Sequence, residues 1–171
     1  MKHYYFLIIQ MSILFCVSCA PENDENHHYY IIFNNNTGKD LYVIDSSIYP
    51  DTTNGPGGKI FGNQGFCKVE AYRSSSEPLH YLWESYEEAF ILDEYGKRYP
   101  SDTMMVFVYD VETFDKITRH DRVKDSLLLQ EAFRARYDLS LQDLQRLNWT
   151  LSYPPTENMK TIKMWPRYSQ Q

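Results

Sequence analysis

The chain has 171 residues, a net charge of −6 at pH 7 and three cysteines, and 43% of its residues are hydrophobic. This length and composition indicate one globular domain and exclude a disordered chain, a collagen-like fibre and a polytopic membrane protein. The acidic charge balance argues against binding to nucleic acid, which needs clustered cations, and three cysteines cannot build a disulfide framework.

The N-terminus has the pattern of a secretion signal. Lys2 precedes an apolar stretch over residues 6–17, and a cation followed by a short apolar run is typical of a signal peptide. As a helix this stretch is about 18 Å long, too short for a bilayer core of roughly 30 Å. It ends in Ser18-Cys19, which resembles a bacterial lipobox. The resemblance implies cleavage after residue 18 and acylation of Cys19; the alternative is a secreted protein whose Cys19 carries no lipid.

Residues 1–18 are therefore a predicted lipoprotein signal peptide, and residues 19–28 a lipidated cysteine followed by a flexible acidic tether. The acidic side chains just after Cys19 resemble the cluster that directs Bacteroidetes-type lipoproteins to the outer leaflet. This resemblance implies an outer-membrane protein, anchored by lipid on the periplasmic or cell-surface face. His27 and His28 end the tether, but adjacent histidines on a flexible segment lack the preset geometry of a metal site.

The first half of the predicted domain, residues 29–171, contains mainly strands. Residues 28–33 and 40–45 are apolar and are joined by an Asn/Gly-rich segment, which predicts a β-hairpin. A second hairpin is predicted to include residues 66–73, where Cys67 faces the core as an inert thiol. The other predicted elements in this half are a helix over residues 83–91, with Ser85 and Glu88 spaced as a capping box, and a fully buried strand over residues 103–109.

Helical patterns are more frequent in the second half. Residues 111–136 lack alternation and carry ion pairs at helical spacing, which predicts a helix. Ser140 is the expected N-cap of a second helix over residues 141–147. Residues 149–153 alternate as a strand in which Trp149 anchors the core, and residues 159–165 are expected to fold back on them as a hairpin. We therefore predict an α+β fold, an antiparallel β-sheet or sandwich with two or three short helices inserted in the second half.

No catalytic residue, metal site or cofactor is predicted. The Gly-rich residues 55–60 lack the first glycine and the Ser/Thr of a phosphate-binding loop. His80 and His120 are the histidines of the mature chain outside the tether, and neither belongs to a recognisable nucleophile motif. They leave a small envelope hydrolase open as an alternative function.

Tyrosine-rich aromatic residues give the leading specific idea, a binding surface. Tyr86, Tyr95, Tyr99 and Trp165 lie beside polar or loop residues, and exposed aromatic rings can stack on sugar rings or on partner side chains. Core packing and sheet covering explain the same residues equally well. The partner expected for such a surface is a protein or a glycan.

Three stretches together resemble a family of small, uncharacterised Bacteroidetes-type lipoproteins: residues 47–52, residues 105–113 and residues 136–149, which read RYDLSLQDLQRLNW. The likeness spans about residues 40–155, and it implies an envelope-anchored protein without implying any activity or catalytic residue. In addition, Asp51-Thr52-Thr53 resembles the Asp-Ser/Thr acceptor of O-glycosylation in Bacteroidetes-type secreted proteins, which implies modification at Thr52.

The expected function is a non-catalytic binding or accessory lipoprotein. Its expected partners are the membrane, through the lipid at Cys19, and a protein or glycan ligand. The alternatives are the small envelope hydrolase and a lipoprotein inhibitor or immunity factor that blocks an incoming enzyme.

Overall fold

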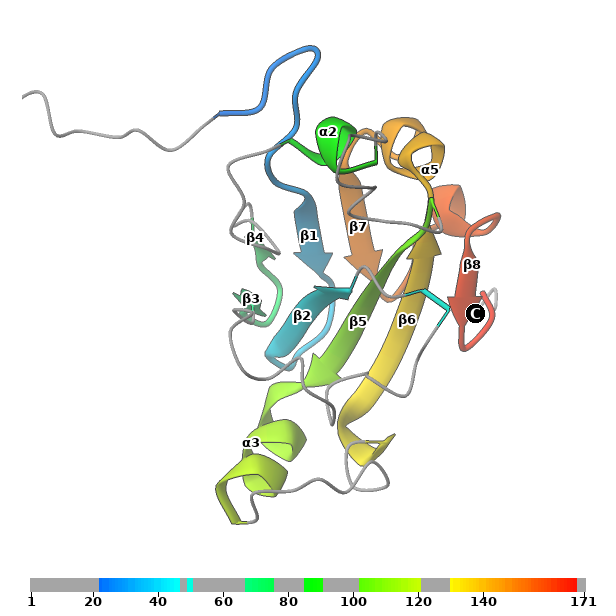
Figure 1. The fold of residues 1–171 in the computed structure, drawn as a ribbon. Coiled ribbons are helices and arrows are strands. Elements are labelled where there is room, and N and C mark those ends of the chain that lie inside the picture. Colours follow the sequence, from blue (N-terminus) through cyan, green and yellow to red (C-terminus); the bar gives the residue numbers. More distant parts are fainter. Residues whose placement is uncertain are drawn as a thin grey trace, which may run out of the picture.

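The computed structural model describes residues 22–46, 49–50, 67–75, 85–90, 102–120 and 130–168, and for residues 117–120 it describes the backbone alone. Within these residues the chain forms two β-sheets with short helices at their ends (Figure 1). This arrangement confirms the predicted α+β fold class. The predicted lipidation site Cys19 and the predicted glycosylation site Thr52 lie outside the described residues.

Five antiparallel strands form the larger sheet, in the order β3-β2-β5-β6-β8. All residues of the central strand β5 are buried, which confirms the prediction of an interior strand. Val43 lies opposite Val108, and Tyr137 lies opposite Val106. The strands are β2 (Leu41–Ser46), β3 (Cys67–Val69), β5 (Met104–Asp110), β6 (Phe133–Leu139) and β8 (Lys163–Trp165).

The smaller sheet has three strands in the order β4-β1-β7. β1 runs antiparallel to β4 and parallel to β7, with Ile32 opposite Thr150. A parallel pair cannot be closed by a tight turn, and here the whole larger sheet except β8 lies between β1 and β7 along the chain. The strands are β1 (Ile32–Asn35), β4 (Ser74–Ser75) and β7 (Thr150–Tyr153).

The main hydrophobic core contains residues of both sheets. Phe33 of β1 and Val106 of β5 belong to one buried cluster. A second cluster covers the other face of the larger sheet, where Phe107 of β5 packs with Phe114 of α3 (Val111–His120). Because both faces of the larger sheet are covered, its central strand has a continuous apolar sequence in place of an alternating one.

The helices lie at opposite ends of the sheets, α2 and α5 at one end and α3 at the other (Figure 1). α2 (Tyr86–Phe90) begins with the predicted capping box, in which the Ser85 N–H donates to Glu88 Oε2 at 2.8 Å and the Glu88 N–H donates to Ser85 Oγ at 3.3 Å. α5 (Leu141–Arg146) begins at Ser140, which confirms the predicted N-cap, and Asp143 completes a second capping box with it. A short 3₁₀ helix, η2 (Glu157–Met159), precedes β8.

Two predicted strand pairings are wrong. β1 and β2 do not form a hairpin, because β1 belongs to the smaller sheet and β2 to the larger. The Asn35 amide fixes the turn between them by donating to the carbonyls of Lys39, Val69 and Glu70. The final strand β8 pairs with β6 and not with β7. Local alternation identifies a strand, but its partner depends on contacts between distant segments.

The predicted helix over residues 111–136 is confirmed at its start, where α3 spans Val111–His120, and is wrong at its end, because β6 begins at Phe133. Residues 121–129 lie outside the described residues. The pair of Glu131 and Arg134 at helical spacing suggested a helix, but the Arg134 guanidinium instead lies 3.4 Å from the buried Asp110 carboxylate. Arg134 therefore pairs with Asp110 at the end of the neighbouring strand β5, and not with a residue of its own helix as the sequence pattern predicted.

Candidate binding site

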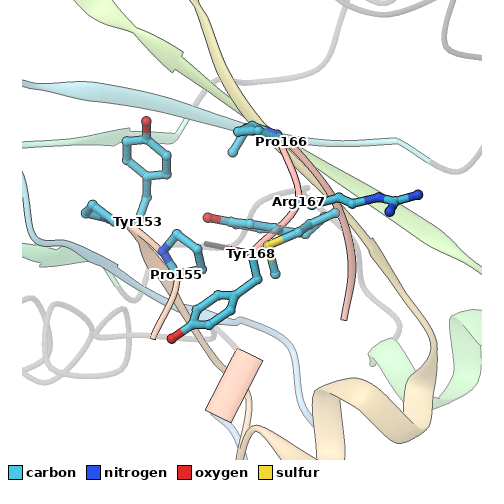
Figure 2. Close-up of a pocket in the computed structure, with 9 residues that line it drawn as sticks. Tyr153, Pro155, Pro166, Arg167 and Tyr168 are labelled. Atoms are coloured by element: carbon cyan, nitrogen blue, oxygen red, sulfur yellow. The ribbon is translucent and has the colours of Figure 1, made fainter. Parts of the chain in front are cut away.

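A pocket of about 350 Å³ lies beside β6 and β8, where the chain leaves β7 (Figure 2). Strands β6 and β8 provide one wall, and the segments that follow β7 and β8 provide the others. The lining is rich in tyrosine and proline, with one cation: Ala135, Tyr137, Tyr153, Pro154, Pro155, Met164, Pro166, Arg167 and Tyr168.

The wall formed by the larger sheet follows from strand geometry. Ala135 and Tyr137 are two residues apart on β6, so both side chains point to the same face. Met164 of β8 lies opposite Tyr137 in the sheet register and is also buried. Ala135 is buried and has the smallest side chain of the lining.

Prolines shape the other walls. Pro154 and Pro155 follow β7 at once, and Pro166 follows β8. The Tyr153–Pro154 and Trp165–Pro166 peptide bonds are both cis. Because proline has no N–H and a fixed φ, it ends each strand and presents a rigid apolar ring to the pocket.

The phenols of the pocket are neutral hydrogen-bonding groups. Burial raises the pKa of Tyr137 far above its usual range, and the Tyr137 hydroxyl donates to the Ser152 carbonyl at 2.9 Å. Burial also raises the pKa of Tyr153, which is half-buried. Tyr168 donates its hydroxyl to Glu157 at 3.2 Å. In Figure 2 the Arg167 guanidinium points away from the Tyr153 and Tyr168 rings, so the pocket itself is lined by rings and hydroxyls.

Of the four aromatic residues predicted to be exposed, the structure confirms the exposure of one, Trp165. Trp165 is 58% exposed, whereas Tyr86 is fully buried in the core. Tyr95 and Tyr99 lie outside the described residues. The pocket tyrosines were not singled out by the sequence, although the Tyr-Pro-Pro run at residues 153–155 could have indicated a rigid aromatic wall beyond a strand end.

The remaining candidate residues show no reactive arrangement in the part of the chain that the structure describes. Cys67 is buried, with its sulfur 3.2 Å from the Ser75 hydroxyl, which confirms that the thiol faces the core. His80 lies outside the described residues, and only the backbone of His120 is described, at the end of α3. No group of three potential metal ligands occurs among residues with described positions.

His28, at the end of the predicted tether, is bound to the domain. Its ring nitrogen Nδ1 lies 2.6 Å from Glu87 Oε1, and its backbone N–H donates to Glu87 Oε2 at 2.8 Å. Its imidazole stacks on Trp149, with the ring centroids 4.0 Å apart. The side chain is therefore held between a carboxylate and an indole, and this contact fixes the point where the N-terminal segment meets the domain.

Comparison with known proteins identifies no relative: no protein-family model, no curated protein and no solved structure matches this chain. Among the helices of the described residues, none is long and apolar enough to cross a bilayer.

Proposed function

We propose that the protein is a non-catalytic binding protein of the cell envelope and that its pocket binds a sugar ring of a glycan. The observation that carries this proposal is the lining of the pocket, in which the partly exposed rings of Tyr153 and Tyr168 are combined with three prolines. A pyranose ring has apolar C–H faces and a rim of hydroxyls. The aromatic and proline rings match those faces, and the phenol groups match the rim.

The size of the pocket favours a small unit of a larger ligand. At about 350 Å³ it lies near the lower end of the range of ligand-binding cavities, roughly 300–1,000 Å³. It can therefore hold one or two sugar rings but not a folded protein segment. The walls of the pocket lie at the ends of strands from both sheets. The core of the domain therefore holds the lining residues in place, and few of them need to become ordered when a ligand binds.

Two variants test the pocket. Ala135→Leu should fill the space from the β6 wall, and Tyr153→Ala should remove a ring from the opposite wall. The probe is a panel of defined neutral and acidic oligosaccharides, titrated against the purified full-length mature protein in detergent. We expect the wild type to bind at least one oligosaccharide and both variants to bind it at least about tenfold more weakly, a loss of about 1.4 kcal/mol.

Tyr72→Ala is the matched control, since Tyr72 is an exposed tyrosine at the turn between β3 and β4. Its binding should equal that of the wild type, and the unfolding midpoints of all variants establish that they are folded. Failure of every oligosaccharide to bind the wild type would contradict the proposal.

We further propose that acylated Cys19 anchors the protein at the outer membrane. The supporting observation is the short apolar run that ends in Ser18-Cys19. Each buried methylene contributes about 0.8 kcal/mol, so several acyl chains hold a protein far better than one. Growth with labelled palmitate should label the wild type and leave Cys19→Ala unlabelled, and equal labelling of the two would contradict the anchor.

O-glycosylation at Thr52 is proposed on the Asp51-Thr52-Thr53 sequence. A carbohydrate at this position adds mass to the polypeptide and its lipid. The intact mass of the native protein should therefore exceed the lipidated polypeptide, and Thr52→Ala should remove the excess. A native mass that equals polypeptide plus lipid would rule the modification out.

A further inference from the structure

An exposed tryptophan lies on the opposite face of β8 from the pocket. Trp165 is 58% exposed, and neighbouring Met164, which lines the pocket, is buried. Successive side chains of a strand point to opposite faces, so Trp165 stands on the outer face of the larger sheet. Pro166, the next residue, belongs to the pocket lining. The indole and the pocket therefore lie on the two sides of one short edge strand.

The Trp165 ring is supported from within the fold. Its centroid lies 5.0 Å from that of Phe133, at an interplanar angle of 36°. Phe133 in turn lies 5.6 Å from Tyr109, which is buried in the second hydrophobic cluster. A side chain that is held in this way loses little rotamer freedom when a ligand stacks on it.

Two cations stand on the same face as Trp165. Arg136 of β6 lies opposite Trp165 in the sheet register, and Lys163 precedes Trp165 by two residues. Both contact Asp138, with Arg136 Nε at 2.8 Å and Lys163 Nζ at 3.4 Å from its carboxylate oxygens. Lys163 Nζ also donates to the Tyr49 hydroxyl at 2.7 Å.

The exposure of these charges is unequal. The Asp138 side chain is 2% exposed, whereas the Lys163 side chain is 65% exposed. The Arg136 side chain lies between these values, at 23% exposed. The carboxylate is thus withdrawn beneath the exposed Lys163 and is paired with the partly buried Arg136. Among the described side chains on this face, the two cations beside Trp165 meet one carboxylate, Asp138, although the whole chain has a net charge of −6.

We propose that Trp165, Arg136 and Lys163 form a subsite for an acidic sugar, and that the glycan bound by this protein contains uronate residues. This inference rests on the proposed function, because it names the class of glycan. The indole provides a flat apolar face for the sugar ring, and the guanidinium and ammonium groups provide charge-assisted donors for its carboxylate. A chain that crosses the end of β8 can place one ring on Trp165 and another in the pocket.

The test compares uronate oligosaccharides with neutral forms of the same chains. Oligomers of galacturonate, of alginate and of glucuronate-containing chains are each titrated with the full-length mature protein in detergent, beside their carboxyl-reduced counterparts. We expect at least one acidic form to bind about tenfold or more tightly than its reduced form. Raising the ionic strength from about 0.01 M to about 1 M shortens the Debye length from about 30 Å to about 3 Å, and this should reduce the preference.

Variants of the subsite separate stacking from charge. Trp165→Ala should weaken binding of the acidic form at least about tenfold, and Trp165→Phe should recover part of that loss. Lys163→Gln and Arg136→Gln should each weaken binding of the acidic form about two- to fivefold and leave binding of the reduced form unchanged. Lys116→Gln is the matched control, because Lys116 is an exposed lysine paired with Glu112 on α3, and it should bind both forms as the wild type does.

The outcomes distinguish this inference from the proposed function. Equal affinity for acidic and reduced forms, or wild-type affinity in Trp165→Ala, overturns the uronate subsite while glycan binding in the pocket stands. Binding to no oligosaccharide overturns both. A membrane surface is the alternative occupant of this site. It is tested by sedimentation of the Cys19→Ala protein, which lacks the lipid, with vesicles of phosphatidylglycerol. Vesicle binding that depends on Trp165 and Lys163, in a protein that does not bind uronates, also overturns the subsite.

Discussion

Trp149 and Trp165 have the same side chain in opposite environments. Trp149 is 6% exposed and lies in the main core, where its ring stacks on His28 and lies near Tyr86. Its φ of 56° is in the left-handed region, which bulky residues seldom adopt. The contacts of the indole therefore hold a strained backbone in place. This environment confirms the expectation that Trp149 is a core anchor.

Replacing each tryptophan should separate stability from binding. Trp149→Ala should lower the free energy of unfolding by about 3–5 kcal/mol, because truncation leaves a cavity in the core. Trp165→Ala should change it by about 1 kcal/mol or less, since most of the ring faces solvent. Urea unfolding of both variants measures the difference, and a Trp149→Ala protein as stable as the wild type would contradict the core assignment.

Asp110 is a buried carboxylate at the junction of β5 and α3. Its side chain is 1% exposed. The carboxylate accepts hydrogen bonds from the Thr113 N–H at 2.9 Å and from the Thr113 hydroxyl at 2.8 Å. It also lies 3.2 Å from Lys39 Nζ. Burial opposes its ionisation, but the hydrogen bonds of Thr113 and Lys39 and the charge of Arg134 outweigh that effect and lower its pKa from 3.8 to about 2. The ionised form therefore stabilises the fold.

This lowered pKa predicts a loss of stability in acid. The contribution of Asp110 is fully present above its unfolded-state pKa near 3.8 and is lost as the pH falls toward about 2. A shift of this size corresponds to roughly 2 kcal/mol. Asp110→Asn should be less stable than the wild type at pH 7 by about that amount, and the two should converge near pH 2. Denaturant unfolding across this pH range is the measurement, and a constant difference between the proteins would refute the assignment.

Among the elements, α5 is fixed at both ends by local hydrogen bonds. At its start the Asp143 N–H donates to Ser140 Oγ at 3.2 Å, and the Ser140 N–H donates to Asp143 Oδ2 at 3.1 Å. At its end the Trp149 N–H donates to the Leu144 carbonyl and the Asn148 N–H to the Gln145 carbonyl, with Asn148 left-handed. These are the two bonds of a Schellman motif, and they direct the chain from α5 into β7.

Ser140→Ala should lower the free energy of unfolding by about 1 kcal/mol, because it removes the acceptor for an N–H in the first turn of α5. Ser140→Thr keeps the hydroxyl and should retain most of the stability. Thermal unfolding of the two variants gives the comparison. If Ser140→Ala and Ser140→Thr melt together, the capping interaction has no net effect.

Elements governed by neighbours in sequence could be predicted. The capping boxes at Ser85 and Ser140 depend on residues three positions apart, and the burial of β5 follows from an unbroken apolar run. The partners of β1 and β8 could not be predicted, since each is chosen by packing between the two sheets. The start of β6 resembled a helix because Glu131 and Arg134 have helical spacing, whereas Arg134 finds its carboxylate partner, Asp110, only in the folded sheet.

The pocket could not be predicted for a related reason. It is assembled where two strands end, and apart from the Tyr-Pro-Pro run at residues 153–155 nothing in the sequence separates its tyrosines from core residues. Trp165 was predicted to be exposed because it lies beside polar or loop residues. Composition therefore indicated an aromatic surface, but the site itself depends on the docking of β7 and β8 against β6.

At the scale of the whole molecule, one buried hydrogen bond joins the two sheets beside the pocket. Tyr137 belongs to β6 of the larger sheet, and its hydroxyl donates to the carbonyl of Ser152 in β7 of the smaller sheet at 2.9 Å. Both residues are buried. The bond therefore stabilises the contact between the sheets and fixes the position of the Tyr153-Pro154-Pro155 wall, which follows Ser152 directly.

Tyr137→Phe should lower the free energy of unfolding by about 1–2 kcal/mol, because it removes the hydroxyl donor from a buried carbonyl and leaves the ring unchanged. Tyr168→Phe is the matched control from the same pocket: its hydroxyl bonds to the exposed Glu157, where water can replace it, so its stability should change by less than about 0.5 kcal/mol. Urea unfolding compares the two. Equal effects of the two substitutions would show that the bond from Tyr137 to Ser152 contributes nothing to the cohesion of the sheets.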